Sequence, residues 1–368
     1  MGENHLTYFK IQNFKRFDSF EMENIGQFNL IVGDNNVGKT SVLEGLLFSE
    51  DGDSSLSDLF QTLIYRRLII SDENKVFANL NDDNLWKLIF KNLSKSLKIN
   101  NEYGSGKEEI SWELIQFKDL NESDWKAINR KGYRKDEPSI FKNGLRVSSG
   151  SEINRNFYPF ARTTNEEIDM NFGYLPFVPT NIGYDSDLLD FYYSKINIDK
   201  DLRKEFEVNL KTLIPKLEET RTQKMLNDLD FICVVLEDEN GIYPLTRFGD
   251  GVVKLTRVLL EILMAKGERL MIDEIETGIH FSRLKNFWKT VILLCKKYDV
   301  QLFATTHSLE CQRYFVEAFS ELEEEDREKA RNISLIETPQ GNVESVTYNF
   351  EQFELALKAG ANTRGGQR

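Results

Sequence analysis

The sequence is poor in cysteine, has no long apolar run and carries fewer basic than acidic residues. Its three cysteines lie far apart among apolar or helical neighbours and lack metal-ligand spacing, so we expect buried free thiols at Cys233, Cys295 and Cys311. No apolar run approaches the roughly 18 residues of a membrane-spanning helix. Residues 1–5 lack the basic and apolar parts of a signal peptide. These absences argue against a membrane or secreted protein and predict a cytoplasmic location.

The charge balance limits the class of partner. A net charge of −13 over 368 residues argues against a surface that is basic throughout. It does not exclude DNA, because a local patch of Lys and Arg binds phosphates even in an acidic chain. The hydrophobic fraction of 40% and the charged fraction of 29% are typical of a globular protein with a sizeable core.

A phosphate-binding loop is the clearest motif in the chain. The stretch from Gly33 to Thr40 reads GDNNVGKT and matches the pattern GxxxxGK[ST] at every fixed position. An apolar run at 28–32 predicts a buried strand before it, and 41–47 predicts a helix after it. Such a strand, turn and helix N-terminus direct backbone N–H groups at one point, where an anion binds. The flanking elements disfavour the alternative, a glycine-rich turn without a ligand.

The motif also assigns roles within the loop. Lys39 is expected to reach the β- and γ-phosphates and to assist catalysis, and the Thr40 hydroxyl to bind Mg²⁺. The predicted cofactor-binding residues of this loop are Gly33, Asn35, Asn36, Gly38, Lys39, Thr40 and Ser41.

A second motif supplies carboxylates. The apolar strand from Arg269 ends in Asp273 and Glu274, the pattern of a Walker B segment. In that pattern Asp273 lies near Mg²⁺, and Glu274 orients or deprotonates the water that attacks the γ-phosphate. A further strand at 300–304 leads to His307. A histidine at the carboxyl end of a parallel strand can hydrogen-bond a γ-phosphate oxygen, so we predict that His307 is catalytic.

Three charged or aromatic side chains each allow two interpretations. Lys15 and Arg16, just before the loop, would contact nucleotide phosphates or remain solvated beside a turn. His280 would begin a helix or contact another subunit.

The remaining elements are predicted from hydrophobic periodicity. We expect antiparallel strands at 6–14 and 17–25, a hairpin formed by 96–99 and 109–117, a loop-rich β region at 118–172, a helical stretch at 188–229, strands at 231–236 and 242–245, helices at 56–68, 255–265 and 281–298, an acidic helix at 320–331 and an amphipathic tail.

Four motifs in order resemble the AAA15/AAA21 group of ABC-type ATPases, relatives of RecF, SMC and OLD proteins: GDNNVGKT, FGDGVVK, LMIDEIETGIH and ATTHS. The resemblance implies an α/β P-loop NTPase head of the ABC/RecF/SMC type, with a mixed sheet flanked by helices, an antiparallel β lobe and a short helical arm. The expected domains are the first part of the head at 1–50, the inserted lobe at 51–180, the arm at 181–224 and the second part of the head at 225–368.

The resemblance adds two candidate groups to the site. FGDGVVK stands where the ABC signature stands, with Gly249 in place of its serine, so backbone N–H groups would contact phosphate at Gly249, Asp250 and Gly251. Taken alone, such a turn is most often an ordinary connection. A glutamine after the P-loop contacts Mg²⁺ in ABC-type ATPases, which makes Gln61 either a metal contact or a surface residue of an amphipathic helix.

The resemblance also implies how the protein acts. Two heads would face each other head to tail around shared ATP and Mg²⁺, and hydrolysis would separate them. The stretch after Ser308 is too short for the Toprim nuclease of OLD proteins. We therefore expect a sensor ATPase that controls a separate effector, as in anti-phage defence. The alternative is a RecF-like DNA-binding clamp in repair.

Overall fold

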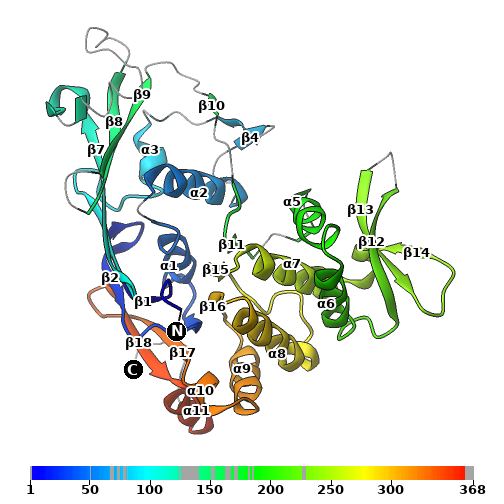
Figure 1. Ribbon diagram of the computed structural model, residues 1–368. Coiled ribbons are helices and arrows are strands. Elements are labelled where there is room, and N and C mark those ends of the chain that lie inside the picture. Colours follow the sequence, from blue (N-terminus) through cyan, green and yellow to red (C-terminus); the bar gives the residue numbers. More distant parts are fainter. Residues whose placement is uncertain are drawn as a thin grey trace.

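The computed structural model describes residues 2–49, 51–66, 70–72, 75–77, 80, 82–122, 124–125, 141–150, 154–161, 167–169, 173–180, 183–184, 186–225 and 229–360. Within these ranges the strands form four sheets. Figure 1 shows a central body with one β lobe above α1 and α2 and a second, smaller lobe beyond α6.

The central sheet has the strand order β11-β15-β16-β3-β17-β18. All neighbours are parallel except β17 and β18. The strands are β3 (Phe28–Gly33), β11 (Phe177–Val178), β15 (Arg269–Ile272), β16 (Gln301–Thr305), β17 (Ala330–Glu337) and β18 (Val343–Asn349). The buried strands expected before the P-loop, in the Walker B segment and before His307 are thus confirmed as three neighbours.

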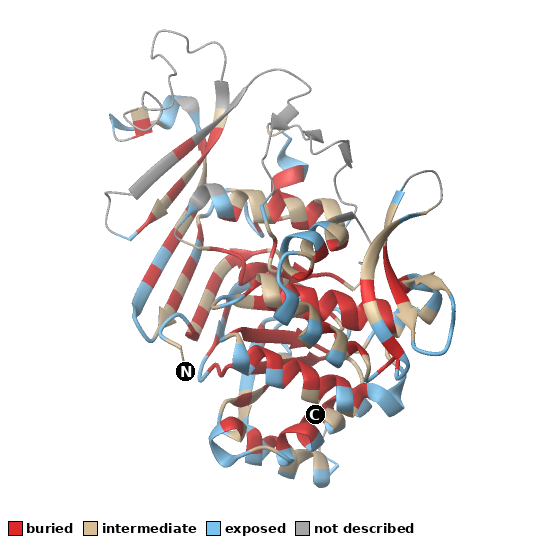
Figure 2. Ribbon diagram, turned by 45° about the vertical axis from the view of Figure 1, so that its right-hand side comes forward, coloured by how far each residue is buried: buried red, intermediate tan, exposed pale blue. Residues whose placement is uncertain are grey.

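Side chains alternate between the two faces of this sheet, as the period of a strand requires. Leu30 and Ile272 face one core, which is shared with α7, α8, α9 and α11. Ile31 and Met271 face the other core, which is shared with α1, α2 and the N-terminal strands. Figure 2 shows buried residues concentrated in the central sheet and in α7. The sheet and its two helical layers confirm the α/β class.

The helices of these layers mostly follow the predicted pattern. Their bounds are α1 (Lys39–Gly45), α2 (Gly52–Tyr65), α3 (Asp83–Trp86), α7 (Asp250–Met264), α8 (Phe281–Lys297), α9 (Leu309–Ser320), α10 (Glu324–Arg327) and α11 (Phe350–Lys358). The predicted acidic helix at 320–331 is wrong: α9 ends at Ser320, α10 has four residues, and β17 begins at Ala330. The chain is drawn into the central sheet there, where β17 pairs with β3.

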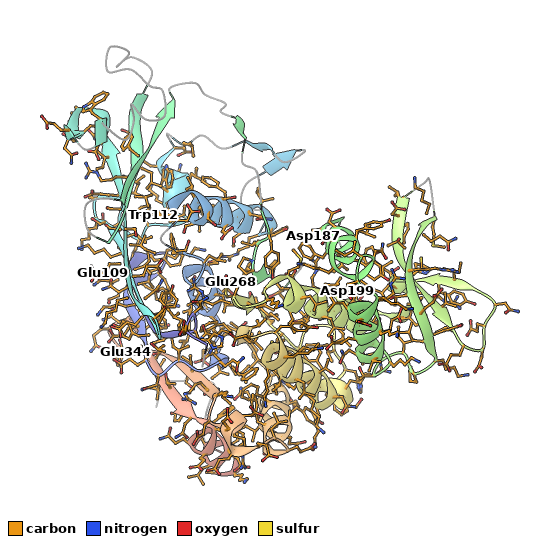
Figure 3. The ribbon with its side chains drawn as sticks, viewed as in Figure 1. Glu109, Trp112, Asp187, Asp199, Glu268 and Glu344 are labelled. Atoms are coloured by element: carbon orange, nitrogen blue, oxygen red, sulfur yellow. The ribbon has the colours of Figure 1, made fainter. Side chains whose placement is uncertain are left out.

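The N-terminal lobe is an antiparallel sheet of order β2-β1-β6-β7-β8-β9. Its strands are β1 (Leu6–Phe14), β2 (Phe17–Met22), β6 (Leu97–Tyr103), β7 (Gly106–Gln116), β8 (Phe141–Ser149) and β9 (Asn154–Ala161). Both predicted antiparallel pairs are confirmed. Trp112 of β7, labelled in Figure 3, packs edge-on against Phe48 and joins the lobe to the head. Parts of the predicted β region 118–172 lie outside the described residues.

A separate small sheet has the strand order β10-β5-β4, and its strands are β10 (Glu167–Asp169), β5 (Lys75–Phe77) and β4 (Ile70–Asp72). Among the residues with described placement, all three cysteines are buried and free, as expected. No helix described here is long and apolar enough to cross a membrane.

The predicted arm is helical only in its first half. It contains α5 (Ser186–Phe191), a π-helical turn at Tyr192–Ile196 and α6 (Lys200–Leu210). After Pro215 the chain forms β12 (Leu217–Met225), which pairs with β13 (Leu229–Leu236), and β13 pairs with β14 (Ile242–Pro244). The helical prediction to residue 229 is therefore wrong. The residues after Pro215, Leu217 among them, form a strand because the next β-prone segment, β13, folds back and pairs with them, while Leu226 lies outside the described residues.

Candidate nucleotide-binding site

The site forms where three neighbouring parallel strands end. The carboxyl ends of β3, β16 and β15 lead to Gly33, Thr305 and Asp273. In an open α/β sheet this edge is the usual place for a ligand. The P-loop, the Walker B carboxylates and the His307 segment therefore meet although they are far apart in the chain.

The P-loop has the backbone of an anion-binding turn. Asn36 has a φ of 63° and Gly38 a φ of 107°, both in the left-handed region. A Cβ atom on Gly38 would lie 2.8 Å from the Phe17 ring, so glycine is required there for space as well as conformation. Helix α1 then begins at Lys39. Asn35 is exposed in the loop and Ser41 is half-buried at the helix start. Their contact with nucleotide stays a prediction.

The Lys39 ammonium lies folded into this loop. Its Nζ donates to the Gly33 carbonyl at 2.8 Å and to the Asp34 carbonyl at 2.9 Å. Desolvation lowers the pKa of Lys39 to about 8, against the opposing effect of carboxylates led by Asp273. The ammonium is thus held in place for a phosphate, without a directly bonded carboxylate to neutralise it.

Asp273 is surrounded by hydroxyl groups. Its Oδ2 accepts hydrogen bonds from Thr40 at 3.0 Å and Thr180 at 3.2 Å, and its Oδ1 accepts one from Thr305 at 2.6 Å. The Thr40 hydroxyl and one carboxylate are the kind of oxygen ligands that Mg²⁺ takes alongside substrate phosphates and waters. No group of three or more His, Cys, Asp or Glu that could hold a metal occurs in the described part of the chain. The donor set therefore fits Mg²⁺ bound together with nucleotide.

Glu274 and His307 face each other beside this carboxylate. His307 Nε2 lies 3.4 Å from Glu274 Oε1, and the two side chains are 36% and 35% exposed. Glu274 has a φ of 46°, a costly backbone conformation for a residue with a side chain. Its amide donates to Thr305 Oγ1 at 2.8 Å, which holds the turn. Both groups therefore remain accessible to a ligand and water.

Two site residues were missed by sequence reasoning. Thr180 follows the short strand β11, and the apolar 175–178 run before it was the available signal. Glu276 lies in the segment after Walker B, and its Oε1 accepts hydrogen bonds from Thr306 Oγ1 at 2.7 Å, the His307 amide at 3.1 Å and the Ser308 amide at 3.2 Å. Glu276 thus fixes the backbone that carries His307.

Gln61 lies on α2, and its Nε2 donates to the Tyr65 hydroxyl at 3.3 Å. Its contact with Mg²⁺ stays a prediction. Thr180 reaches Asp273 from the end of β11, which lies beside β15.

The residues around the site resolve some of the open alternatives. Lys15 pairs with the buried carboxylate of Glu44, and Arg16 donates to the Asn36 carbonyl of the P-loop and to Glu337 at 2.9 Å. Neither is simply solvated. His280 caps α8, which bears out its place at a helix start.

The turn that precedes α7 is exposed to solvent. Gly249 precedes the helix with a φ of 87°, makes no side-chain cap and is exposed, as is Asp250. Gly251 packs against the segment after Walker B: a Cβ atom there would lie 3.0 Å from the Gly278 carbonyl. The Gly249 amide donates to the Thr246 carbonyl at 3.4 Å, and the Val252 and Val253 amides donate to the Gly249 carbonyl at 3.1 and 3.3 Å, so the exposed turn closes the start of the helix next to that segment.

Residues 28–310 match the model of a family described as "AAA domain, putative AbiEii toxin, Type IV TA system". The match contains the P-loop, Walker B and His307. The chain belongs to this family, AAA_21, and is an ATPase of the AAA type. The AAA_21 chain is also 22% identical, over 320 residues, to a protein of Helicobacter pylori (strain ATCC 700392 / 26695) named "ATP/GTP phosphatase", with 82% of this chain and 85% of that protein covered.

Solved structures of similar arrangement include SMC heads. One is the SMC head domain from Thermotoga maritima, with a TM-score of 0.45, 13% identity and coverage of 94% of this chain and 99% of that one. Another is the SmcHead bound to the C-winged helix domain of ScpA, with a TM-score of 0.49, 12% identity and coverage of 94% and 99%.

Proposed function

We propose that this AAA_21 chain binds Mg²⁺ with ATP at the strand ends described above and hydrolyses it to ADP and phosphate. The observation that carries the proposal is the grouping of Thr40 with Asp273 and of Glu274 with His307 at adjacent strand ends. The name of the Helicobacter pylori relative supports a nucleoside triphosphate substrate, with GTP as the competing base to test.

Each residue has a chemical task in this proposal. Lys39 moves from the loop carbonyls to phosphate oxygens and compensates their charge. Glu274 orients the attacking water and accepts its proton, while His307 donates a hydrogen bond to a γ-phosphate oxygen. Thr40 and Asp273 would hold Mg²⁺, which supplies charge stabilisation of the transferring phosphoryl group.

The proposal includes a second copy of the chain. The exposed turn at Gly249 presents the N-terminus of a 15-residue helix that has no side-chain cap, which suits contact with a nucleotide held by another subunit. Two copies related head to tail would then share each site. ATP would hold the pair together and hydrolysis would release it.

The proposed role is control of a separate effector. The family description names a putative toxin of a type IV toxin–antitoxin system, which supports a link to a toxic activity. Control of a separate effector, with anti-phage defence as the setting, is the part that we add. A RecF-like clamp predicts a different partner. ATP turnover that rises strongly with duplex DNA, and falls again with added salt, would favour the clamp.

Phosphate release by a Glu274→Gln variant tests the catalytic assignment. We expect turnover to fall by at least about a hundredfold, because the water loses its base. ATP binding should persist, so light scattering should show an ATP-dependent rise in mass. Glu268→Gln, an exposed carboxylate at the other end of β15, is the matched control. Equal turnover in the two variants would contradict the assignment.

A further inference from the structure

A buried lysine faces the site without a hydrogen-bond partner. Lys254 lies on α7, one turn after the exposed Gly249 turn, and is 6% exposed. Its Nζ is buried and makes no hydrogen bond. Burial of an unpaired ammonium costs free energy, so we expect an acceptor for Lys254 at this place in the structure.

The charges around Lys254 identify the acceptor. Burial lowers the pKa of Lys254 to about 8, and the attraction of Asp273, Glu276 and Glu274 opposes that change. The Lys254 side chain thus lies among the carboxylates of the site, with Arg257 as a cationic neighbour that lowers its pKa further. Asp273 already accepts three hydroxyl hydrogen bonds over its two oxygens.

Glu276 has a buried acceptor atom without a hydrogen-bond donor. Its Oε1 accepts three hydrogen bonds from the segment that carries His307, while its Oε2 is buried and accepts none. A buried carboxylate oxygen and a buried ammonium, both unsatisfied and attracted to each other, lie on two segments in contact. That contact is the packing of Gly251 on Gly278.

We propose that Lys254 is a positioning residue that pairs with Glu276 through one water molecule and so places His307 beside Glu274. The pair links the exposed turn at the start of α7 to the hydrolytic groups of the same chain. A second copy that docks on this turn would move α7 and, through Lys254 and Glu276, His307. The catalytic part of this inference rests on the proposed function.

A double-mutant cycle tests the pair. The variants are Lys254→Met, Glu276→Gln, both together, and Lys254→Arg, with Lys266→Met as the control, since Lys266 is exposed at the other end of α7. Each variant is measured for kcat, for KM and for its midpoint in urea. If the residues act as a pair, each single change should lower kcat by about tenfold, and the double variant should be no worse than the poorer single one.

Two further readouts separate this role from simple loss of packing. Lys254→Arg should retain most of kcat, and KM for ATP should change less than kcat in all variants, because the proposed effect is on His307. The proposed pairing would be overturned if the loss of kcat in the double variant equalled the product of the two single losses. It would also be overturned if Lys254→Met behaved like Lys266→Met. If no variant or parent hydrolyses ATP, the proposed function fails, and non-additive urea midpoints still decide whether the pair exists.

Discussion

At the residue scale, the structure places several ionisable groups where they are partly or fully withdrawn from water. Asp58 on α2 illustrates the effect away from the nucleotide site. Desolvation, with a smaller contribution from Asp51, raises the pKa of the Asp58 carboxyl to about 7. The folded chain therefore holds a proton on this group at pH values where an unfolded aspartate has lost it.

The raised pKa of Asp58 predicts a pH dependence of stability. The pKa of this carboxyl is about 4 in the unfolded chain and about 7 in the folded chain, so between these pH values the folded chain binds one proton more. The group therefore favours folding at low pH, and this contribution to the free energy of unfolding is lost as the pH rises through 7. Asp58→Asn should therefore stabilise the chain above pH 7, by about 1–2 kcal/mol, and less at pH 5. Urea denaturation at the two pH values, with Asp201→Asn on the surface of α6 as control, measures it. An equal shift at both pH values would contradict this.

At the scale of elements, α7 is tied to the arm by one buried guanidinium. Arg257 is fully buried and donates to both carboxylate oxygens of Asp187 on α5, at 2.7 and 2.8 Å. It also donates to Glu261 at 3.2 Å and to the Gly183 carbonyl at 3.1 Å. Figure 3 shows Asp187 at the side of α5 that meets α7. Helix α7 therefore carries the exposed Gly249 turn at one end and an anchor to the arm in its middle.

Removal of this anchor should destabilise the chain. Arg257→Met leaves two carboxylates without their cation, a loss of about 3–5 kcal/mol for a buried pair. Arg257→Lys keeps the charge but not the two-pronged geometry, so we expect a smaller loss. Chemical denaturation of both variants measures the order. A Lys variant as unstable as the Met variant would show that geometry, rather than charge, carries the stability.

At the scale of the whole molecule, the segment after Walker B and the start of α7 form one surface with an exposed aromatic residue. Phe281 begins α8, is 57% exposed and has the His280 ring 4.4 Å away, centroid to centroid. The same segment contacts the Gly249 turn through Gly278 and Asp250. An exposed aromatic beside a proposed subunit contact suits burial against a second copy.

Phe281→Glu should therefore weaken the ATP-dependent pair without loss of folding. We expect ATPase activity per chain to fall about tenfold at low protein concentration, and less at high concentration, because a shared site needs two copies. Leu293→Glu is the matched control, since Leu293 is 54% exposed three turns further along the same helix. Activity per chain that stays constant on dilution in the parent protein would contradict the shared site.

Local sequence patterns predicted much of the candidate site. The P-loop needs a glycine turn between a strand and a helix, and the Walker B carboxylates and His307 follow apolar strands, so neighbours in the chain reveal them. Hydrophobic periodicity predicted both N-terminal strand pairs, and the resemblance of the motifs to a known family implied the α/β class.

Other features of the fold and the site were decided only by the tertiary structure, because most of the residues that determine them lie far apart in the chain. Thr180 and Asp273 are 93 positions apart in the sequence, and their contact forms only when β11 pairs with β15. Residues after Pro215 carry helix-like spacing, yet they form a strand because the neighbouring segment β13 folds back and pairs with them, a local pairing that the spacing did not reveal. Lys254 looks like an ordinary helix residue until packing removes its water and places it among the carboxylates of the site, since burial and charge act through space rather than along the sequence.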